Sequence, residues 1–109
     1  MNDKIVPFLF HVSPKSNRAS ILKSGVDPIF SHGIRKVSWW VDTRALMWAV
    51  SHCSDRYGVS PANLDVFIVK ASAVPQMRNA GFVGLHMTGC RVKVSEYLSA
   101  LKALETYSG

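Results

Sequence analysis

The spacing of hydrophobic and polar positions along the chain predicts five strands. Each is a short run that alternates between apolar and polar positions or is rich in β-branched and aromatic residues. The runs are residues 5–12, 37–41, 64–71, 81–87 and 90–94. The run at 64–71 is apolar on both faces, so we expect it in the middle of a covered sheet.

Three further segments have the period of a helix. They are residues 16–25, 42–58 and a last one that opens at Ser95. Residues typical of N-caps stand at their starts, and glycines stand at the ends of the first two. The apolar face predicted for the second helix consists of Ala45, Trp48, Ala49, His52 and Cys53.

These elements predict one α+β domain over residues 1–109. We expect a small, mostly antiparallel sheet with flanking helices, which follow the first and second strands and close the chain. The segment 25–36 holds two glycines and a proline and has no helical period. We therefore expect it to be an exposed loop.

His11 is the first candidate for chemistry, because it follows three apolar residues at a strand end and precedes a turn. A strand fixes such a group while the following loop leaves room for a ligand. The alternative is a core histidine whose ring nitrogen is satisfied by a backbone carbonyl. Both interpretations stay open from the sequence.

Trp39 and Trp40 are the second candidate. Neighbouring residues of a strand point to opposite faces, so one indole can anchor the core while the other lies open on a cleft wall. An exposed indole is a stacking platform for a flat ring. The alternative is that both indoles are buried between sheet and helices.

Composition and charge add a possible kind of partner. Thirteen Lys and Arg against seven Asp and Glu give a net charge of +6. This charge would attract a polyanion such as nucleic acid, and the alternative is a basic surface that is simply solvated. The first apolar stretch is too short for a membrane span and lacks a signal-peptide pattern. We expect a cytoplasmic protein with no membrane partner.

The two cysteines are too few for a disulfide framework, which fits a reducing compartment, and we expect Cys53 and Cys90 to be buried thiols. With His52 and His86 they supply the ligand types of a zinc site. The spacing matches no recognised finger, and packing explains His52 and Cys53 on their helix. No metal site is predicted.

The segment from Phe10 to Gly25 reads F-H-V-S-P-x-x-N-x-x-S-I-L-x-x-G, and a glycine-bearing loop and a V-S-W-W-V-D strand follow it. Together these segments resemble the ADP-ribosyltransferase superfamily. Within the superfamily, the chain most resembles small bacterial and phage-associated members, including the DNA-modifying ADP-ribosyltransferase toxins. The resemblance covers residues 8–71, and the rest of the chain is matched only by strand order. It implies an ADP-ribosyltransferase-like α+β fold, in which the small sheet is split.

The resemblance implies that NAD binds as a substrate. His11 matches the histidine that hydrogen-bonds the ribose next to nicotinamide, and Val12 would hold the carboxamide through its backbone N–H and C=O. Ser13 matches the Ser or Thr that follows in the family. Trp39 or Trp40 stands where an aromatic residue flanks the nicotinamide ring.

Asn17 and Arg18 open the first helix, where the helix dipole and the cation would favour a diphosphate. The family's transferases usually place a glutamate on a late strand. Glu96 is the match in this chain, and its alternative role is that of a first-turn helix residue. The resemblance therefore names His11 and Glu96 as the catalytic pair.

Three functions follow from these observations. The first is transfer of ADP-ribose to a macromolecular acceptor, a nucleic acid or a protein. The second is RNA 2'-phosphotransferase activity, for which Lys15, Arg18, Arg35 and Lys36 would converge on a phosphate. The third is a binding or inhibitory module without catalysis.

Overall fold

The computed structural model describes residues 7–30, 34, 36–74 and 76–107. Its strands are β1 (Phe8–Pro14), β2 (Ser38–Val41), β3 (Leu64–Lys70), β4 (Arg78–Asn79), β5 (Leu85–Thr88) and β6 (Glu96–Ser99). Its helices are α1 (Arg18–Ser24), α2 (Leu46–Tyr57) and α3 (Ala100–Tyr107). Four short 3-10 helices complete the chain: η1 (Lys15–Asn17), η2 (Pro28–Phe30), η3 (Pro61–Asn63) and η4 (Ala71–Ala73).

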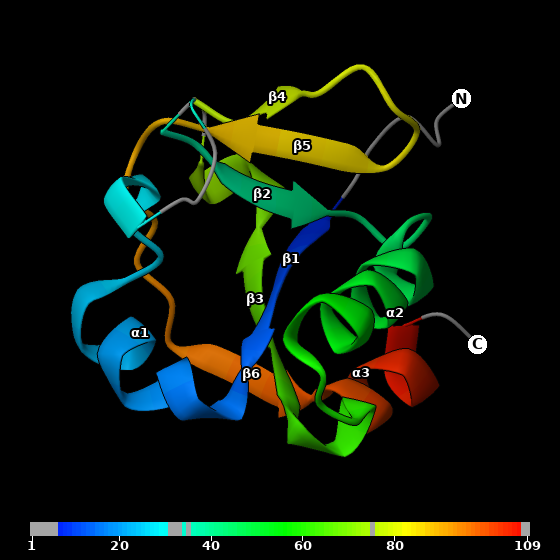
Figure 1. Ribbon diagram of the computed structural model, residues 1–109. Helices are drawn as coiled ribbons and strands as arrows, with labels where there is room; N and C mark the ends of the chain where they lie inside the picture. The colour runs from blue at the N-terminus through cyan, green and yellow to red at the C-terminus, as the bar shows by residue number, and fades with distance from the viewer. Residues whose placement is uncertain (1–6, 31–33, 35, 75, 108–109) are drawn as a thin grey trace.

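The strands form one antiparallel sheet in the order β4-β5-β2-β1-β3-β6 (Figure 1). β1 pairs with β3 at every residue from Phe8 to Pro14, but its pairing with β2 is registered only at Phe10 and Val41. In Figure 1, β2 and β5 cross above β1 and β3 at a steep angle. The sheet therefore opens between β1 and β2, and the edge of β1 beyond Phe10 is left without a neighbouring strand.

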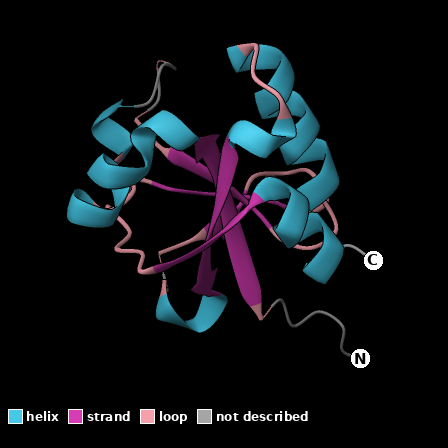
Figure 2. Ribbon diagram, turned by 90° about the horizontal axis from the view of Figure 1, so that it is seen from below, coloured by secondary structure: helices cyan, strands magenta, loops and turns pink. Residues whose placement is uncertain are grey.

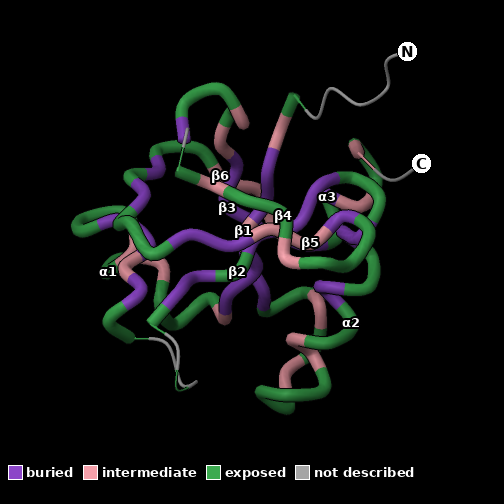
Figure 3. The backbone as a smooth tube through the Cα atoms, turned by 90° about the horizontal axis from the view of Figure 1, so that it is seen from above, coloured by how far each residue is buried: buried purple, intermediate pink, exposed green. Residues whose placement is uncertain are grey.

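Helices cover both faces of the sheet, as Figure 2 shows. One hydrophobic cluster joins Phe10, Val12 and Val66 to α2 and α3. The other surrounds Trp40 and Phe67 on the face that carries α1. In Figure 3 the buried backbone gathers around β1 and β3. The predicted α+β class and the antiparallel sheet are confirmed. The 64–71 strand, β3, lies inside the sheet between β1 and β6, but it is the fifth of the six strands and not the middle one.

Two buried carboxylates, those of Asp65 and Asp42, attach the helical segments to this sheet. Arg18 at the start of α1 donates from Nε and Nη2 to the two carboxylate oxygens of Asp65, both at 2.8 Å, and Asp65 is fully buried in β3. Asp42, just after β2, accepts hydrogen bonds from Arg44 and from His86 of β5. The first carboxylate ties α1 to β3, and the second ties β5 to the segment before α2.

The third predicted helix was placed too early. Residues 96–99 form the edge strand β6, which pairs with β3, and the helix begins at Ala100. The leucine spacing fits a helix, but β3 would otherwise have an unpaired edge, and pairing that edge outweighs the local period. The helices predicted at 16–25 and 42–58 are confirmed as α1 and α2, which end before Gly25 and Gly58.

The late strands also differ from the sequence prediction. Residues 81–84 form a turn with positive φ at both glycines. β5 therefore begins only at Leu85, and it ends at Thr88, one residue after the predicted run. The run at 90–94 contributes an isolated bridge between Val92 and Val26. The loop predicted at 25–36 contains η2, and the two-residue strand β4 carried no signal in the sequence.

The buried side of α2 is rotated from the predicted one. Leu46, Ala49 and Val50 face the core, whereas Trp48 is 54% exposed and His52 is also exposed. Cys90, expected to be a buried thiol, is exposed as well. In the described part of the chain, no helix is long and apolar enough to cross a membrane.

Candidate functional site

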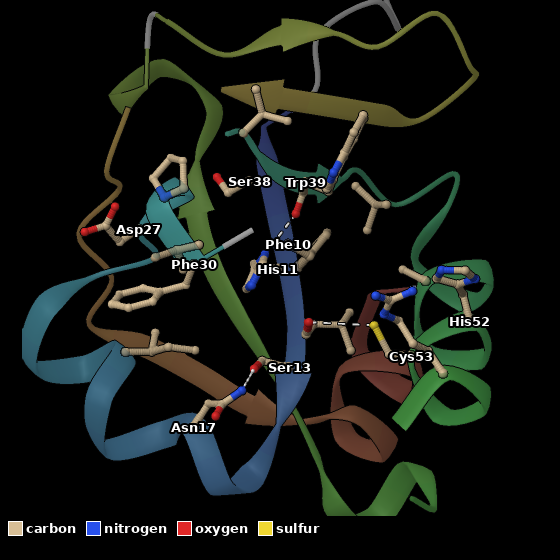
Figure 4. Close-up of a pocket in the computed structure, with 18 of the residues that line it drawn as sticks. Phe10, His11, Ser13, Asn17, Asp27, Phe30, Ser38, Trp39, His52 and Cys53 are labelled. Atoms are coloured by element: carbon tan, nitrogen blue, oxygen red, sulfur yellow. Dashed lines mark hydrogen bonds between the residues drawn. The ribbon is translucent and has the colours of Figure 1, made fainter. Parts of the chain in front are cut away.

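A cavity of about 1030 Å³ lies along the edge of β1 that β2 leaves unpaired (Figure 4). The floor is made by residues 11–13, and β2 forms the upper border with Ser38 and Trp39. One wall consists of α1 and η2, and the opposite wall is α2. The divergence of β1 from β2 thus creates a groove between helices that belong to the two faces of the sheet.

His11 lies on this floor with one ring nitrogen engaged and the other free of any recorded partner among the described residues. Its Nδ1 lies 2.9 Å from the backbone carbonyl oxygen of Trp39. A carbonyl only accepts, so Nδ1 carries the proton and Nε2 of the neutral ring is an acceptor. In Figure 4 this second nitrogen points away from Trp39 into the groove.

The surroundings of His11 favour this neutral form. Burial lowers the pKa of His11, and the hydrogen bond to the Trp39 carbonyl opposes the shift only in part. The ring also packs against the indole of Trp40, with ring centroids 5.2 Å apart. His11 is therefore both satisfied by a backbone carbonyl and available to a ligand, which combines the two interpretations left open by the sequence.

The backbone of Val12 also faces the groove. Its carbonyl oxygen lies 3.7 Å from Sγ of Cys53, and burial raises the pKa of that thiol, which keeps its proton for this weak bond. In an antiparallel ladder the N–H and C=O of one residue point to the same side. Val12 therefore presents a donor and an acceptor beside His11, along the edge that faces away from β3.

The remaining floor residue, Ser13, is buried, and its hydroxyl oxygen accepts a hydrogen bond from Nδ2 of Asn17 at 3.0 Å. Both residues line the cavity. Asn17 belongs to η1 and makes no side-chain cap on α1. Its amide thus fixes the Ser13 hydroxyl at the lower end of the floor, as Figure 4 shows.

The two tryptophans have different positions, as strand alternation predicts. Trp40 is completely buried and donates from Nε1 to the Ser38 hydroxyl at 2.8 Å. Trp39 is 44% exposed and lines the cavity. Of the two, only Trp39 can stack on a ligand, and Trp40 acts on the site through its contact with His11.

Two residues named from the resemblance are not brought to the cavity. The guanidinium of Arg18 is held by Asp65 and lies 4.7 Å from the ring centre of Tyr97. Glu96 is exposed on β6, two strands away from β1, and is not part of the cavity lining. Alternation along β6 puts Tyr97, and not Glu96, on the face of the sheet that carries His11.

The basic cluster considered for a phosphate substrate is not assembled either. Arg35 lies outside the described residues, and Arg18 is committed to Asp65. Among the described residues that line the cavity, Arg56 is the one Lys or Arg side chain. It projects from the α2 wall and not from the segments in which the sequence suggested a phosphate site.

Several lining residues were not predicted as site residues. They are Asp27 and Phe30 on one wall and Trp48, His52, Cys53 and Arg56 on the other. The sequence signal for the α2 wall was available, since a tryptophan and a histidine four residues apart lie on one stripe of a helix, but it was interpreted as core packing. Within the described ranges no group of three or more His, Cys, Asp or Glu could hold a metal ion.

Comparison with protein-family models, with curated proteins and with solved structures finds no significant match to this chain.

Proposed function

We propose that this protein binds NAD in the groove beside β1, as an ADP-ribosyltransferase-like domain that transfers ADP-ribose to a macromolecular acceptor. The observation that carries the proposal is the pair formed by His11 and Val12. A neutral imidazole with a free acceptor nitrogen suits a ribose hydroxyl, and a backbone N–H and C=O side by side suit a primary carboxamide. The volume of the groove, about 1030 Å³, lies at the upper limit of the range for small-molecule sites.

The reaction we propose breaks the bond between the anomeric carbon of ribose and the nicotinamide nitrogen. The bonding electron pair leaves with nicotinamide, which departs as the neutral molecule. The acceptor atom then bonds to the anomeric carbon of the cationic sugar and releases its proton to the solvent. Such a step depends on positioning and on stabilisation of positive charge more than on covalent help from the protein. His11 and Val12 would position the sugar and the leaving group, and Trp39 borders the space for the ring.

The main alternative is an NAD-binding module without turnover, and one observation favours it. The one carboxylate among the described lining residues is Asp27, whose Oδ1 already accepts the backbone N–H of Ile29 at 3.0 Å. Glu96, the residue carried over from the family, lies elsewhere. The RNA 2'-phosphotransferase alternative has less support, since Arg56 alone supplies positive charge from a Lys or Arg in the described lining.

Calorimetric titration with NAD tests the binding proposal on the wild type and on His11→Phe. The phenylalanine keeps a flat ring against Trp40 but removes the acceptor nitrogen. We expect NAD affinity to fall about tenfold or more in the variant, because one hydrogen bond to a buried partner is lost. Equal affinities would remove His11 from the site, and no binding to the wild type would refute the cofactor.

Release of nicotinamide then separates transferase from binding module. We expect release by the wild type when nucleic-acid or protein acceptors are present. Glu96→Gln should keep this activity, because the glutamate lies outside the groove. If Glu96→Gln releases no nicotinamide but binds NAD as tightly as the wild type, Glu96 takes part in the reaction. If the wild type releases no nicotinamide, the binding module without turnover is favoured.

A further inference from the structure

The α2 wall of the groove carries a row of side chains that packing does not explain. Trp48, His52 and Arg56 follow one another at intervals of four residues, so they lie on one stripe of the helix. The core side of α2 is made by other residues, and these three are exposed while lining the cavity. A tryptophan that is 54% exposed at a cavity wall costs hydration free energy unless a ligand covers it.

The rings on this stripe are already arranged for stacking. The indole of Trp48 and the imidazole of His52 are nearly parallel, with an interplanar angle of 12° and centroids 5.0 Å apart. Two stacked rings form a flat surface that a third ring can extend. Arg56 stands one turn further along the helix, and its guanidinium lies 5.9 Å from the ring centre of Tyr57.

Flat rings followed by a cation suit a ligand in which a planar base is joined to an anion. Stacking of bases on aromatic side chains together with contacts from arginine is the way proteins hold single-stranded nucleic acid. The charge of the whole chain supports this choice, because a net charge of +6 draws a polyanion toward the surface. A duplex would bury its bases away from Trp48, so the ring stack favours a single strand.

We propose that Trp48, His52 and Arg56 form a binding site for single-stranded nucleic acid, with one base on the ring stack and a neighbouring phosphate at Arg56. The stripe lines the same cavity as His11, on the wall opposite η2, so a strand held there lies beside the floor of the groove. Binding of the strand at this stripe does not depend on the proposed function.

The test is the fluorescence anisotropy of a labelled single-stranded oligonucleotide, DNA or RNA, titrated with the full chain in the absence of NAD. Trp48→Ala should weaken binding fivefold or more, and Trp48→Phe should restore most of it because a ring remains. Arg56→Gln should lower the slope of log K against log salt by about one. Arg91→Gln, an exposed arginine outside α2, changes the net charge equally and should leave the affinity close to that of the wild type.

Several outcomes would overturn the proposal. They are unchanged binding in Trp48→Ala, equal losses in Arg56→Gln and Arg91→Gln, binding of a duplex as tight as that of the single strand, or no binding by the wild type. Failure of NAD to bind in calorimetry would refute the proposed function but not this site. Loss of oligonucleotide binding in the Trp48 variant with NAD affinity retained would support the site as separate from the His11 floor.

Discussion

His11 holds Trp39 with one ring nitrogen and offers the other to the groove, so its protonation state matters for stability as well as for binding. Burial lowers the pKa of His11 below its ordinary value. The unfolded chain therefore takes up the proton first as the pH falls, and folding loses free energy between the unfolded and the folded pKa. Protonation would also turn Nε2 into a donor, which removes the acceptor for a ribose hydroxyl.

We predict that the wild type loses more stability than His11→Phe when the pH falls from about 7.5 to about 5.5. Phenylalanine does not titrate, so the difference between the two proteins isolates the contribution of His11. Urea denaturation at several pH values measures it. Parallel pH profiles of the two proteins would show that His11 titrates alike in the folded and unfolded chains.

Asp42 gives a second prediction about pH and stability, in a more acidic range than that of His11. Burial opposes its ionisation, but hydrogen bonds from Arg44 and His86 outweigh this and lower the pKa of Asp42 to about 2. The carboxylate therefore contributes stability above the unfolded pKa, and the contribution is lost as the pH falls through the folded value. Arg44 is half exposed, so solvent screens part of the interaction.

We predict that Asp42→Asn lowers the free energy of unfolding at neutral pH by roughly 1–2 kcal/mol. The gap to the wild type should narrow as the pH falls from about 4 toward 2. Denaturation curves at neutral and acid pH check both parts. A gap that is the same at both ends would mean that Asp42 acts through its shape and not through its charge.

The sequence was informative about single residues where a local rule decides their environment. Alternation along a strand predicted that one of Trp39 and Trp40 is buried and the other exposed. Which of the two is buried depends on the face of the sheet that α1 covers. Trp48 and His52 were assigned to the core because a period does not say which side of a helix meets the sheet. Arg18 was assigned to a ligand because its partner Asp65 lies 47 residues away in the sequence.

At the scale of elements, two glycines that end helices differ in what surrounds them. Gly25 after α1 has φ 84° and ψ 179°, and a Cβ there would lie 2.7 Å from the carbonyl oxygen of Val92. Gly58 after α2 has φ 65° and ψ 33°, and a Cβ there would meet nothing within 4 Å. An alanine at position 25 would therefore have both an unfavourable backbone conformation and a steric clash. An alanine at position 58 would have only the unfavourable conformation.

We predict that Gly25→Ala lowers the free energy of unfolding by about 2–4 kcal/mol, and Gly58→Ala by about 1 kcal/mol. The matched pair uses the same substitution, so the difference reports the collision with Val92. Thermal melts of both variants measure it. Equal losses would show that the loop carrying Val92 moves aside at little cost.

Elements were predictable from the sequence where their period agreed with their surroundings, as in α1, α2 and β3. The prediction of a helix from Glu96 to Ser99 was wrong, because these residues form a strand on the free edge of β3. That edge lies about 30 residues away in the chain and is not visible in the local pattern. The split of the sheet was expected from the resemblance and not from any period. Nothing in the sequence marked the place where β2 leaves β1.

At the scale of the whole molecule, the sheet has two parts joined at one registered pair, Phe10 with Val41. β1 and β3 are paired along their whole length and largely buried, whereas both residues of β4 are exposed. The part made of β1, β3 and β6 should therefore open less often than the part made of β4, β5 and β2.

We predict that hydrogen exchange is slowest for amides of β1 and β3 that face each other and at least about tenfold faster in β4 and β5. Addition of NAD should slow exchange in β2, because a ligand in the groove bridges the two parts. Exchange measured by mass spectrometry on the free and NAD-saturated protein tests this. Uniform exchange across the sheet would mean that both parts open as one unit.

The unpaired edge of β1 also bears on the solubility of the protein. A strand edge with free backbone groups invites a strand from another molecule, which is how many proteins aggregate. Here α1 and α2 rise on both sides of the edge, and Pro14 ends the strand without an N–H to offer. A strand from another molecule would have to enter between these two helices to reach the edge, so the walls that would hold a ligand also hinder association of the chain with its own copies.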